Sequence, residues 1–477
     1  MILTLDLGSS TTKAVVWDAD GPRARGDSPL ETSFPAADRA EQDPGRWWPS
    51  VVAACAEARA GSPASFAAVS AVGFAAARQT LVPVTAAGRP LGPALLWSDR
   101  RAAAEAAALA DSFGGAEAVR RLTGGVLDGA AVAAKGAWLA AHEPDRLAGS
   151  RWLLTPRDLI VFEMTGAVLT DRTMVSAAGL CDAAGGLVAG LLESIGDRLP
   201  PVVAPDTVAG ALSPRAASEL GLPKGVPVVV GAGDRACEVL GAGAATDRPM
   251  VSWGTTANVS VPVAAFPDPP PDGVVVSRAA GSGFLLEGGL STAGSLIRWL
   301  SDLTGVGADA LMARAADCPA GAGGVIALPW FGGARAPWWR AGARGGFVGV
   351  SFEHDAGHLA RAAVESVAVE VLRCLEATAA PAASLALTGA DGRTTPWAEV
   401  LSGITGLPAL RRRSGQAASA GAALLTAAAT GAGYELETMD PVTDTVAPDP
   451  AAVARYRPWR AAAEAAAHAV LGLGGDR

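Results

Sequence analysis

The stretch D-L-G-S-S-T-T-K at residues 6–13 follows an apolar N-terminal run and is the strongest single indication of the fold. An apolar run that ends on a carboxylate predicts a β-strand whose last side chains reach the edge of a sheet. Gly8 then allows a sharp turn, and Ser9, Thr11 and Thr12 supply hydroxyl groups. Such a turn can hold a magnesium-bound polyphosphate against exposed backbone N–H groups. The same residues also suit an ordinary β-hairpin, so the choice depends on the rest of the chain.

Two later segments repeat this arrangement of an apolar run followed by a glycine turn. In the first, G-A-G-D-R brings Asp234 to a strand tip, where a carboxylate is a candidate general base. In the second, V-S-W-G-T-T-A-N-V at residues 251–259, Gly254 opens the backbone and Thr255 and Thr256 offer hydroxyls. Two such turns can clamp one phosphate chain.

A fourth segment, L-A-L-T-G-A-D-G at residues 385–392, again ends an apolar run in a glycine turn. Gly389, Ala390 and Asp391 form this turn, and the small-residue stretch at residues 418–428 comes later. Small side chains in these places would let a flat ring approach the backbone.

In this order, the four segments resemble the FGGY carbohydrate kinases, a family within the actin-like ATPase fold, from Met1 to about residue 432. Six more stretches carry the same resemblance: E-Q-D-P-x-x-W-W (41–48), L-W-S-D-R-R (96–101), K-G-A-W-L (135–139), P-W-F-G-G-A-R-A-P (329–337), G-G-F-V-G-V (345–350) and H-L-A-R-A-A-V-E (358–365).

The resemblance implies an α/β fold of two actin-like (ribonuclease H-like) lobes, each with a mixed central sheet. ATP and sugar would bind in the cleft between the lobes. We expect an N-terminal lobe at residues 1–245 with the sugar pocket and the first phosphate turn. A C-terminal lobe at residues 246–477 would carry the second phosphate turn and the adenosine site.

Phosphoryl transfer to a sugar hydroxyl needs a metal on the triphosphate, donors that position it, and a carboxylate near the attacking oxygen. We expect Asp6 and Asp234 to hold Mg²⁺ and Asp234 to act as the base, as the resemblance implies. The expected ATP-binding residues are Gly8, Ser9, Thr11, Thr12, Lys13, Gly254, Thr255, Thr256, Gly389, Ala390 and Asp391.

Six residues are candidates for the sugar pocket: Arg78, Gln79, Trp97, Asp99, Asp234 and Arg235. A tryptophan face can stack on the C–H side of a polyol while Arg and Gln bind its hydroxyls. Trp97 is equally compatible with a place in the core. Arg235 either recognises an anionic or highly oxygenated substrate or pairs with a nearby carboxylate.

The motifs match no single substrate subgroup of the family cleanly. D-xylulose, giving xylulose 5-phosphate, is the leading expectation. Glycerol, erythritol, gluconate or another sugar are the alternatives. Ala390 and Asp391 replace glycines usual in the family, and Glu399 and Gly403 replace its usual Gln and Asp, so ATP affinity is an open question.

Two other classes share the fold: an actin-like nucleotide switch and a sugar-sensing regulator derived from a kinase. The switch would lack the G-x-G-D base and the W-S-D-R-R stretch. The regulator would carry a DNA-binding appendage. No G-x-x-x-x-G-K-[ST] string occurs, which disfavours a Walker-type ATPase.

Composition agrees with a large soluble enzyme of 477 residues, half of them apolar. The net charge of −9 disfavours nucleic-acid binding, and no long uncharged apolar stretch predicts a membrane span. The five cysteines are scattered without C-x-x-C spacing, so we expect a reducing cytoplasm rather than a disulfide framework or a zinc site. The expected partner is a small sugar or polyol, and homodimers are common in the family.

Overall fold

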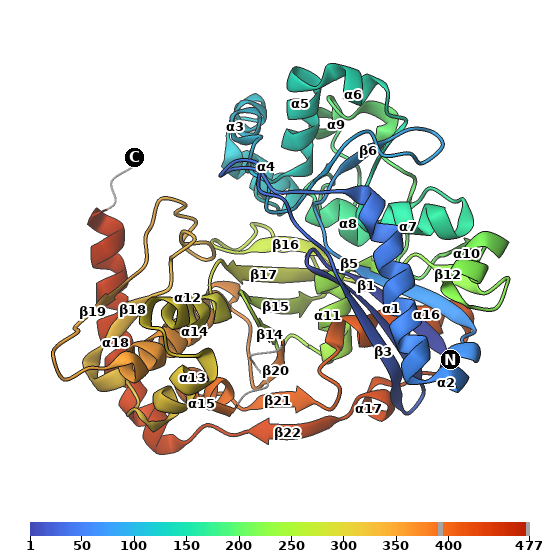
Figure 1. Cartoon of the computed structure of the whole chain (residues 1–477). Helices are drawn as coiled ribbons and strands as arrows, with labels where there is room; N and C mark the ends of the chain where they lie inside the picture. Colours follow the sequence, from blue (N-terminus) through green and yellow to red (C-terminus); the bar gives the residue numbers. More distant parts are fainter. Residues whose placement is uncertain (390–394, 474–477) are drawn as a thin grey trace.

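Two mixed β-sheets of seven strands carry the fold in this computed structural model, which describes residues 1–389 and 395–473 (Figure 1). The first sheet has the order β11-β12-β5-β1-β2-β3, with β13 paired to β5. Its strands are β1 (Ile2–Leu7), β2 (Thr11–Asp18), β3 (Gly21–Pro29), β5 (Ala71–Ala76), β11 (Val208–Ala211), β12 (Pro227–Val229) and β13 (Ala232–Gly233).

The second sheet has the order β16-β17-β15-β14-β20-β21-β22. Its strands are β14 (Met250–Trp253), β15 (Ala257–Val263), β16 (Val275–Arg278), β17 (Phe284–Leu290), β20 (Leu385–Thr388), β21 (Ala409–Arg412) and β22 (Val442–Val446). Four two-stranded pairs lie outside the large sheets: β4 (Glu41–Gln42) with β7 (Ala94–Leu95), β6 (Val82–Val84) with β8 (Trp152–Leu154), β9 (Thr170–Asp171) with β10 (Val202–Val203), and β18 (Ile326–Leu328) with β19 (Gly346–Val348).

The two sheets repeat one topology. In each, three neighbouring strands run antiparallel, β1-β2-β3 and β14-β15-β17, although β16 comes between β15 and β17 in the chain. The first strand of each set also pairs in parallel with a later strand, β5 or β20. The expectation of two actin-like lobes with mixed sheets is confirmed.

Helices cover both sheets. Those in the first half are α1 (Trp47–Gly61), α2 (Pro63–Ala67), α3 (Ala103–Ser112), α4 (Ala116–Thr123), α5 (Val132–His142), α6 (Pro144–Ala148), α7 (Pro156–Thr165), α8 (Arg172–Ala177), α9 (Ala189–Leu192), α10 (Pro214–Leu220) and α11 (Asp234–Ala242), with 3₁₀ turns η1 (Pro44–Arg46) and η2 (Gly196–Arg198). Those in the second half are α12 (Gly294–Thr304), α13 (Ala308–Asp317), α14 (Ala356–Thr378), α15 (Thr395–Thr405), α16 (Ala417–Thr430), α17 (Leu436–Met439) and α18 (Pro450–Leu473), with η3 (Ala322–Gly324).

Local sequence explains where many of these helices begin and end. Helix α7 starts at a capping box in which the Thr155 side chain and Asp158 exchange hydrogen bonds with the backbone, and Pro156 occupies its first position. It ends at Gly166, whose φ of 80° is the left-handed conformation that glycine adopts without strain. These start and stop signals set the ends of α7, which packs against β5, β11 and β12 of the first sheet.

Helices α11 and α16 cross at the centre of the molecule (Figure 1). A Cβ on Gly241 of α11 would lie 1.9 Å from the Ala417 carbonyl oxygen, and one on Gly421 of α16 would lie 1.9 Å from the Cys237 carbonyl oxygen. Helix α16 comes late in the chain, yet it packs on β1 and β5 of the first sheet. The two glycines therefore set how closely the lobes approach along this helix pair.

A helical region containing α3 to α6 and α9 extends from the first lobe and has its own apolar core around Trp138 and Leu139 (Figure 1). Within residues 1–389 and 395–473, no helix is both long and apolar enough to cross a membrane.

Candidate active site

The two aspartates predicted to act together lie at one edge of the first sheet. Asp6 is near the end of β1, where it pairs with Lys13 of β2 and Ala75 of β5. Strand β13 pairs with the end of β5 and leads directly into Asp234, the first residue of α11. Ligands of open α/β sheets bind at the carboxyl ends of parallel strands, which is where this edge lies.

Asp6 lies in a cluster of acidic groups. Lys13 Nζ is 3.3 Å from its Oδ2. Burial raises the pKa of Asp6 most, Lys13 lowers it, and the charges of Asp234 and Glu238 raise it further. The partly buried Asp6 carboxylate therefore has one cation, Lys13, against two neighbouring carboxylates.

Glu238 was not foreseen from the sequence. It follows Asp234 by four residues on α11, so both side chains lie on one face of the helix. Its Oε1 accepts a 2.7 Å hydrogen bond from the Thr388 hydroxyl of β20, and its Oε2 pairs with Arg235. The i, i+4 spacing from Asp234 was the available signal, and it would have placed Glu238 beside the candidate base.

The acidic groups at this edge are of the type that a hydrated divalent cation binds. Asp6, Asp234 and Glu238 supply carboxylate oxygens, which are the ligands that Mg²⁺ prefers, and it usually keeps several waters besides.

The first turn joins β1 to β2, and one of its predicted side chains faces away from it. The Gly8 N–H bonds the Thr11 carbonyl at 3.2 Å, which closes the turn between β1 and β2. Thr12, however, is buried, and its hydroxyl lies 2.7 Å from Ser50 Oγ on α1. Successive side chains of a strand face opposite sides, so Lys13 reaches Asp6 while Thr12 faces the core. The structure contradicts a phosphate contact from the Thr12 side chain.

The second turn and the Gly389 turn lie at neighbouring strand ends, since Ser252 of β14 pairs with Thr388 of β20. Thr255 and Thr256 are exposed. Gly389 has φ 88°, and a Cβ there would lie 2.2 Å from the Trp253 carbonyl oxygen, so only glycine fits.

Ala390 and Asp391, the two altered positions of that turn, lie outside the described residues. Glu399 is exposed on α15. Gly403 packs beneath the Tyr456 ring of α18, where an added Cβ would be 3.0 Å from Cε2. The aromatic ring therefore accounts for a small residue at position 403.

Both arginines proposed for the sugar pocket are paired. Arg78 makes a bidentate bond to Glu287 of β17, at 2.9 and 2.8 Å, and its Nε is 3.4 Å from Asp234 Oδ1. Arg235 pairs with Glu238. Of the two readings of Arg235, pairing with a nearby carboxylate is the one that the structure supports.

Trp97 lies outside the core. It is 37% exposed, and its Nε1 is 3.3 Å from Ser9 Oγ of the first turn. Gln79 has φ 61°, a conformation that few non-glycine residues adopt, and its amide donates to the Ala177 carbonyl at 2.8 Å. Both side chains thus lie near the predicted pocket, with the Gln79 amide partly committed.

Asp99 requires a second correction. It is fully buried, and its carboxylate accepts hydrogen bonds from Arg101 and from the Ala40 N–H. Both oxygens are thereby used, so Asp99 orders the loop that carries Trp97 and does not contact a sugar.

Lys135 is a further positioning residue. Its buried ammonium donates to the carbonyls of Gln79 at 3.0 Å and Leu96 at 2.6 Å, joining the two loops that carry the pocket candidates. Burial is the main cause that lowers the pKa of Lys135 to about 7.

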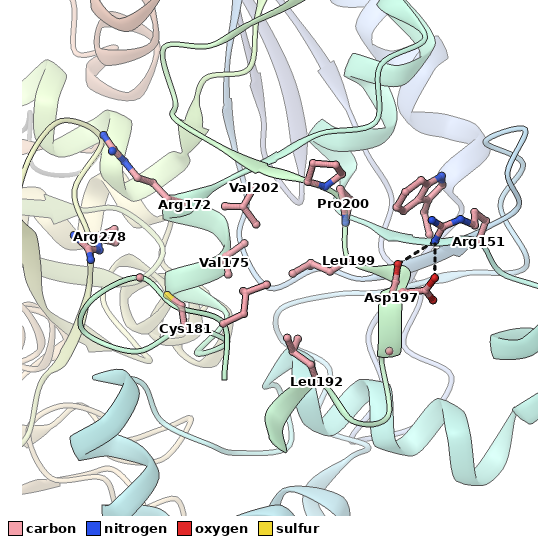
Figure 2. Close-up of a pocket in the computed structure, with 15 residues that line it drawn as sticks. Arg151, Arg172, Val175, Cys181, Leu192, Asp197, Leu199, Pro200, Val202 and Arg278 are labelled. Carbon is pink, nitrogen blue, oxygen red and sulfur yellow. Dashed lines mark hydrogen bonds and ion pairs between the residues drawn. The ribbon is translucent and has the colours of Figure 1, made fainter. Parts of the chain in front are cut away.

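Two other features lie apart from this site. A cavity of about 520 Å³ between α8, α9, β10 and β16 contains none of the predicted site residues; Val175, Leu192 and Leu199 line it, with Arg172 and Arg278 at one side (Figure 2).

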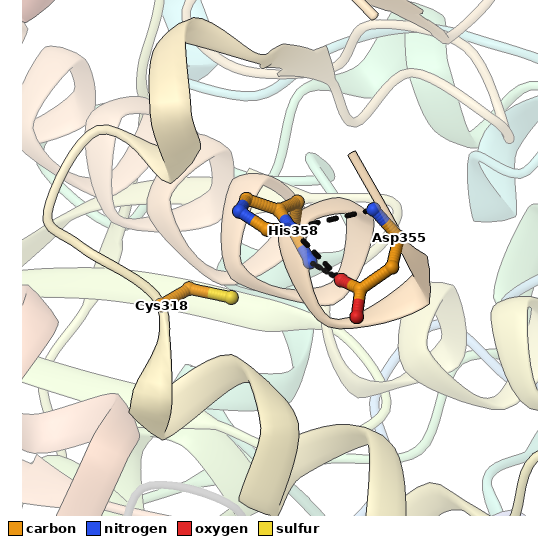
Figure 3. A group of neighbouring side chains, drawn as sticks. All are labelled: Cys318, Asp355 and His358. Atoms are coloured by element: carbon orange, nitrogen blue, oxygen red, sulfur yellow. Dashed lines mark hydrogen bonds and ion pairs between the residues drawn. The ribbon is translucent and has the colours of Figure 1, made fainter. Parts of the chain in front are cut away.

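The other is a cluster of Cys318, Asp355 and His358 at the start of α14 (Figure 3). Asp355 and His358 form the capping box of that helix, and the Cys318 thiol donates to the Arg314 carbonyl at 3.3 Å. Their polar atoms already have structural partners, so no metal is assigned there.

The sequence profile of the FGGY family of carbohydrate kinases, N-terminal domain, matches residues 1–241, and that of its C-terminal domain matches residues 250–430. The chain belongs to this family and is a carbohydrate kinase.

Named relatives divide between substrates. The chain is 31% identical over 476 residues to a xylulose kinase of Streptomyces rubiginosus, covering 97% of this chain and 91% of the relative. It is 31% identical over 465 residues to a glycerol kinase of Alkalilimnicola ehrlichii, covering 90% of each. A solved xyloylose kinase from Brucella ovis superposes with a TM-score of 0.89 at 29% identity, covering 99% of each chain.

Proposed function

We propose that this kinase transfers the γ-phosphoryl group of MgATP to a hydroxyl of a short-chain sugar, with Asp234 as the general base. The observation that carries the proposal is the state of the Asp234 carboxylate. Its Oδ1 accepts from the Arg235 N–H at 2.7 Å and lies near Arg78, whereas Oδ2 has no hydrogen bond within the described residues. Oδ2 is therefore free to accept a proton.

In this mechanism the sugar oxygen attacks the γ-phosphorus, its proton passes to Asp234 Oδ2, and ADP leaves. Bound Mg²⁺ would neutralise charge on the triphosphate, with Asp6 and Asp234 as its proposed ligands. Arg78 orients Asp234 and is itself fixed by Glu287. The Gly8 and Gly254 turns would offer backbone N–H groups and hydroxyls to the phosphates, with Lys13 alongside.

By the similarity of this chain to the named relatives, D-xylulose ranks first among neutral acceptors, with xylulose 5-phosphate as its product. Glycerol and erythritol are neutral alternatives, and gluconate is an acidic one. The two arginines next to Asp234, Arg78 and Arg235, are already paired with glutamates. This pairing bears on the choice between a neutral and an acidic acceptor.

The test is ADP release with MgATP over a panel of D-xylulose, glycerol, erythritol, D-gluconate and a sugar-free control. Asp234→Asn is the test variant, and Glu353→Gln, at an exposed position outside the site, is the matched control. We expect one acceptor to stimulate turnover and Asp234→Asn to lower that rate by about 10²–10⁴. Turnover that is independent of every sugar, or unchanged in Asp234→Asn, would refute the proposal.

A further inference from the structure

One arginine of the cleft, Arg335, is held in a fixed place by the loop between β18 and β19. The Ala336 N–H bonds the Gly289 carbonyl of β17 at 3.2 Å, and the Ser291 hydroxyl donates to the Gly333 carbonyl at 2.6 Å. Arg335 also lies near the Trp339 ring, with Cζ 6.0 Å from its centroid. The loop is thus fastened to β17 on both sides of this side chain.

The Arg335 guanidinium and the Asn258 amide converge on the space above Gly289. A Cβ added to Gly289 would lie 3.5 Å from Arg335 Nη1 and 3.5 Å from Asn258 Nδ2. Asn258 Oδ1 accepts from the Ser260 hydroxyl at 2.8 Å, so its NH₂ group is turned to the other side. A Cβ at position 289 would therefore be in van der Waals contact with both N–H donor groups.

In the part of the chain that the structure describes, no carboxylate pairs with these two donors. Within the described residues, Arg335 has no ion pair or hydrogen bond from its side chain, whereas its electrostatic neighbours are paired with one another. Arg78 pairs with Glu287, and Arg100 with Asp128 at 2.9 Å. Among these described residues, Arg335 is the arginine that is left without an acidic partner.

An unpaired guanidinium that is partly buried is costly, since it has lost water without gaining an anion. Burial and the repulsion from Arg100 lower the pKa of Arg335. A bound anion would offset both effects.

The space above Gly289 lies on the side of β17 that carries Glu287 and, through it, faces Arg78 and Asp234. Gly289 and Glu287 are two residues apart on β17, so they share a face of the sheet, and Glu287 reaches Asp234 through Arg78. The charged neighbours of Arg335 are Arg100, Asp128, Arg78 and Glu287. Those of Asp6, at the phosphate turn, are instead Lys13, Asp234 and Glu238.

We propose that Arg335 and Asn258 bind the carboxylate of an acidic sugar, so that the preferred acceptor is a short-chain sugar acid held with a hydroxyl at Asp234. This inference rests on the proposed kinase function and specifies its substrate class. Gly289 serves it by leaving the backbone open to the ligand.

The test compares acids with alditols of the same carbon skeleton: D-xylonate with xylitol, D-gluconate with D-glucitol, and D-galactonate with galactitol. Binding is measured by calorimetry in the presence of MgADP, with D-xylulose as a neutral ketose. We expect at least one acid to bind about 10–100-fold more tightly than its alditol, the range of a charge-assisted hydrogen bond.

Arg335→Gln should remove this preference and Arg335→Lys should keep part of it. Arg344→Gln, which removes an exposed charge from the same loop, should leave the preference intact. Equal unfolding temperatures of the ligand-free variants would show that the loop is undisturbed. Acids that bind no better than alditols, or a preference that survives in Arg335→Gln, would overturn the inference.

Three further results distinguish the failure of this inference from the failure of the proposed function. If Arg335→Gln weakens MgADP binding instead, the guanidinium serves nucleotide phosphate and the inference fails. If D-xylulose is phosphorylated while every acid is inert, the kinase mechanism stands and the acidic substrate class is wrong. If no sugar binds or is turned over although MgADP binds, both the inference and the proposed function are refuted.

Discussion

Arg78 links the two lobes at the level of a single residue. Its bidentate bond to Glu287 joins the end of β5 to β17, and its Nε approaches Asp234. Burial would raise the pKa of Glu287, but Arg78 holds it below its ordinary value. The pair therefore depends on both partners being present.

We expect Arg78→Met to lower the free energy of unfolding by about 3 kcal/mol, because the Glu287 carboxylate would stay buried without its cation. The measurement is urea denaturation at pH 7. Arg78→Met combined with Glu287→Met should recover much of the stability but not the activity. A double variant as unstable as the sum of the single ones would contradict this reading of the pair.

Lys135 predicts a pH dependence. Its pKa is about 7 in the folded chain against an ordinary 10.5. Between these values the unfolded state binds more protons than the folded state, so the free energy of unfolding should rise with pH from about 7 to about 10. Denaturation at several pH values, with Lys135→Met as the reference, isolates this contribution. A native-minus-variant difference that is flat over this range would contradict it.

The sequence predicted where the strands end, but it did not show which side chains are paired in the folded chain. Asp6, Asp234 and the glycine turns follow from local patterns of apolar runs and turns. Thr12 and Asp99 were misassigned because their partners, Ser50 and Arg101, depend on strand facing and on loop packing.

At the level of elements, the crossing of α11 and α16 positions Asp234. Gly421 of α16 faces the Cys237 carbonyl of α11 too closely for any side chain. Such spacing is not visible in the sequence, where the α16 region reads only as a run of small residues. The helix pair is therefore a feature that the structure adds.

Gly421→Ala should destabilise the chain by about 1–3 kcal/mol and lower the turnover number, because the added methyl forces α11 away from α16. Gly433→Ala, at an exposed position with nothing within 4 Å of the new Cβ, is the control. Thermal unfolding and steady-state rates measure the two effects. Unchanged values in Gly421→Ala would mean that the helices can move apart at no cost.

Across the whole molecule, all five cysteines are free, as the scattered spacing predicted. Burial raises the pKa of Cys55 to about 12 and raises those of Cys237 and Cys374 as well. Of the five, only Cys318 is not buried. We expect a thiol reagent to modify one group quickly in the native protein and all five after denaturation. Rapid reaction of several native thiols would indicate a looser core.

The two-lobe fold was predictable because the motifs resemble the FGGY family in their order along the chain, and that resemblance implies two actin-like lobes. The pairing of charged side chains near Asp234 was not predictable, because it depends on residues from both lobes. Glu238 bonds Thr388 across the two sheets, and among the residues that the structure describes Arg335 has no acidic partner.

The most direct test of phosphoryl transfer is ³¹P NMR of the protein with MgATP and its best acceptor. We predict a new phosphate monoester resonance that grows in step with ADP and is slowed about 10²–10⁴-fold in Asp234→Asn. ADP and inorganic phosphate without any monoester would contradict the central claim and identify the chain as a nucleotide hydrolase.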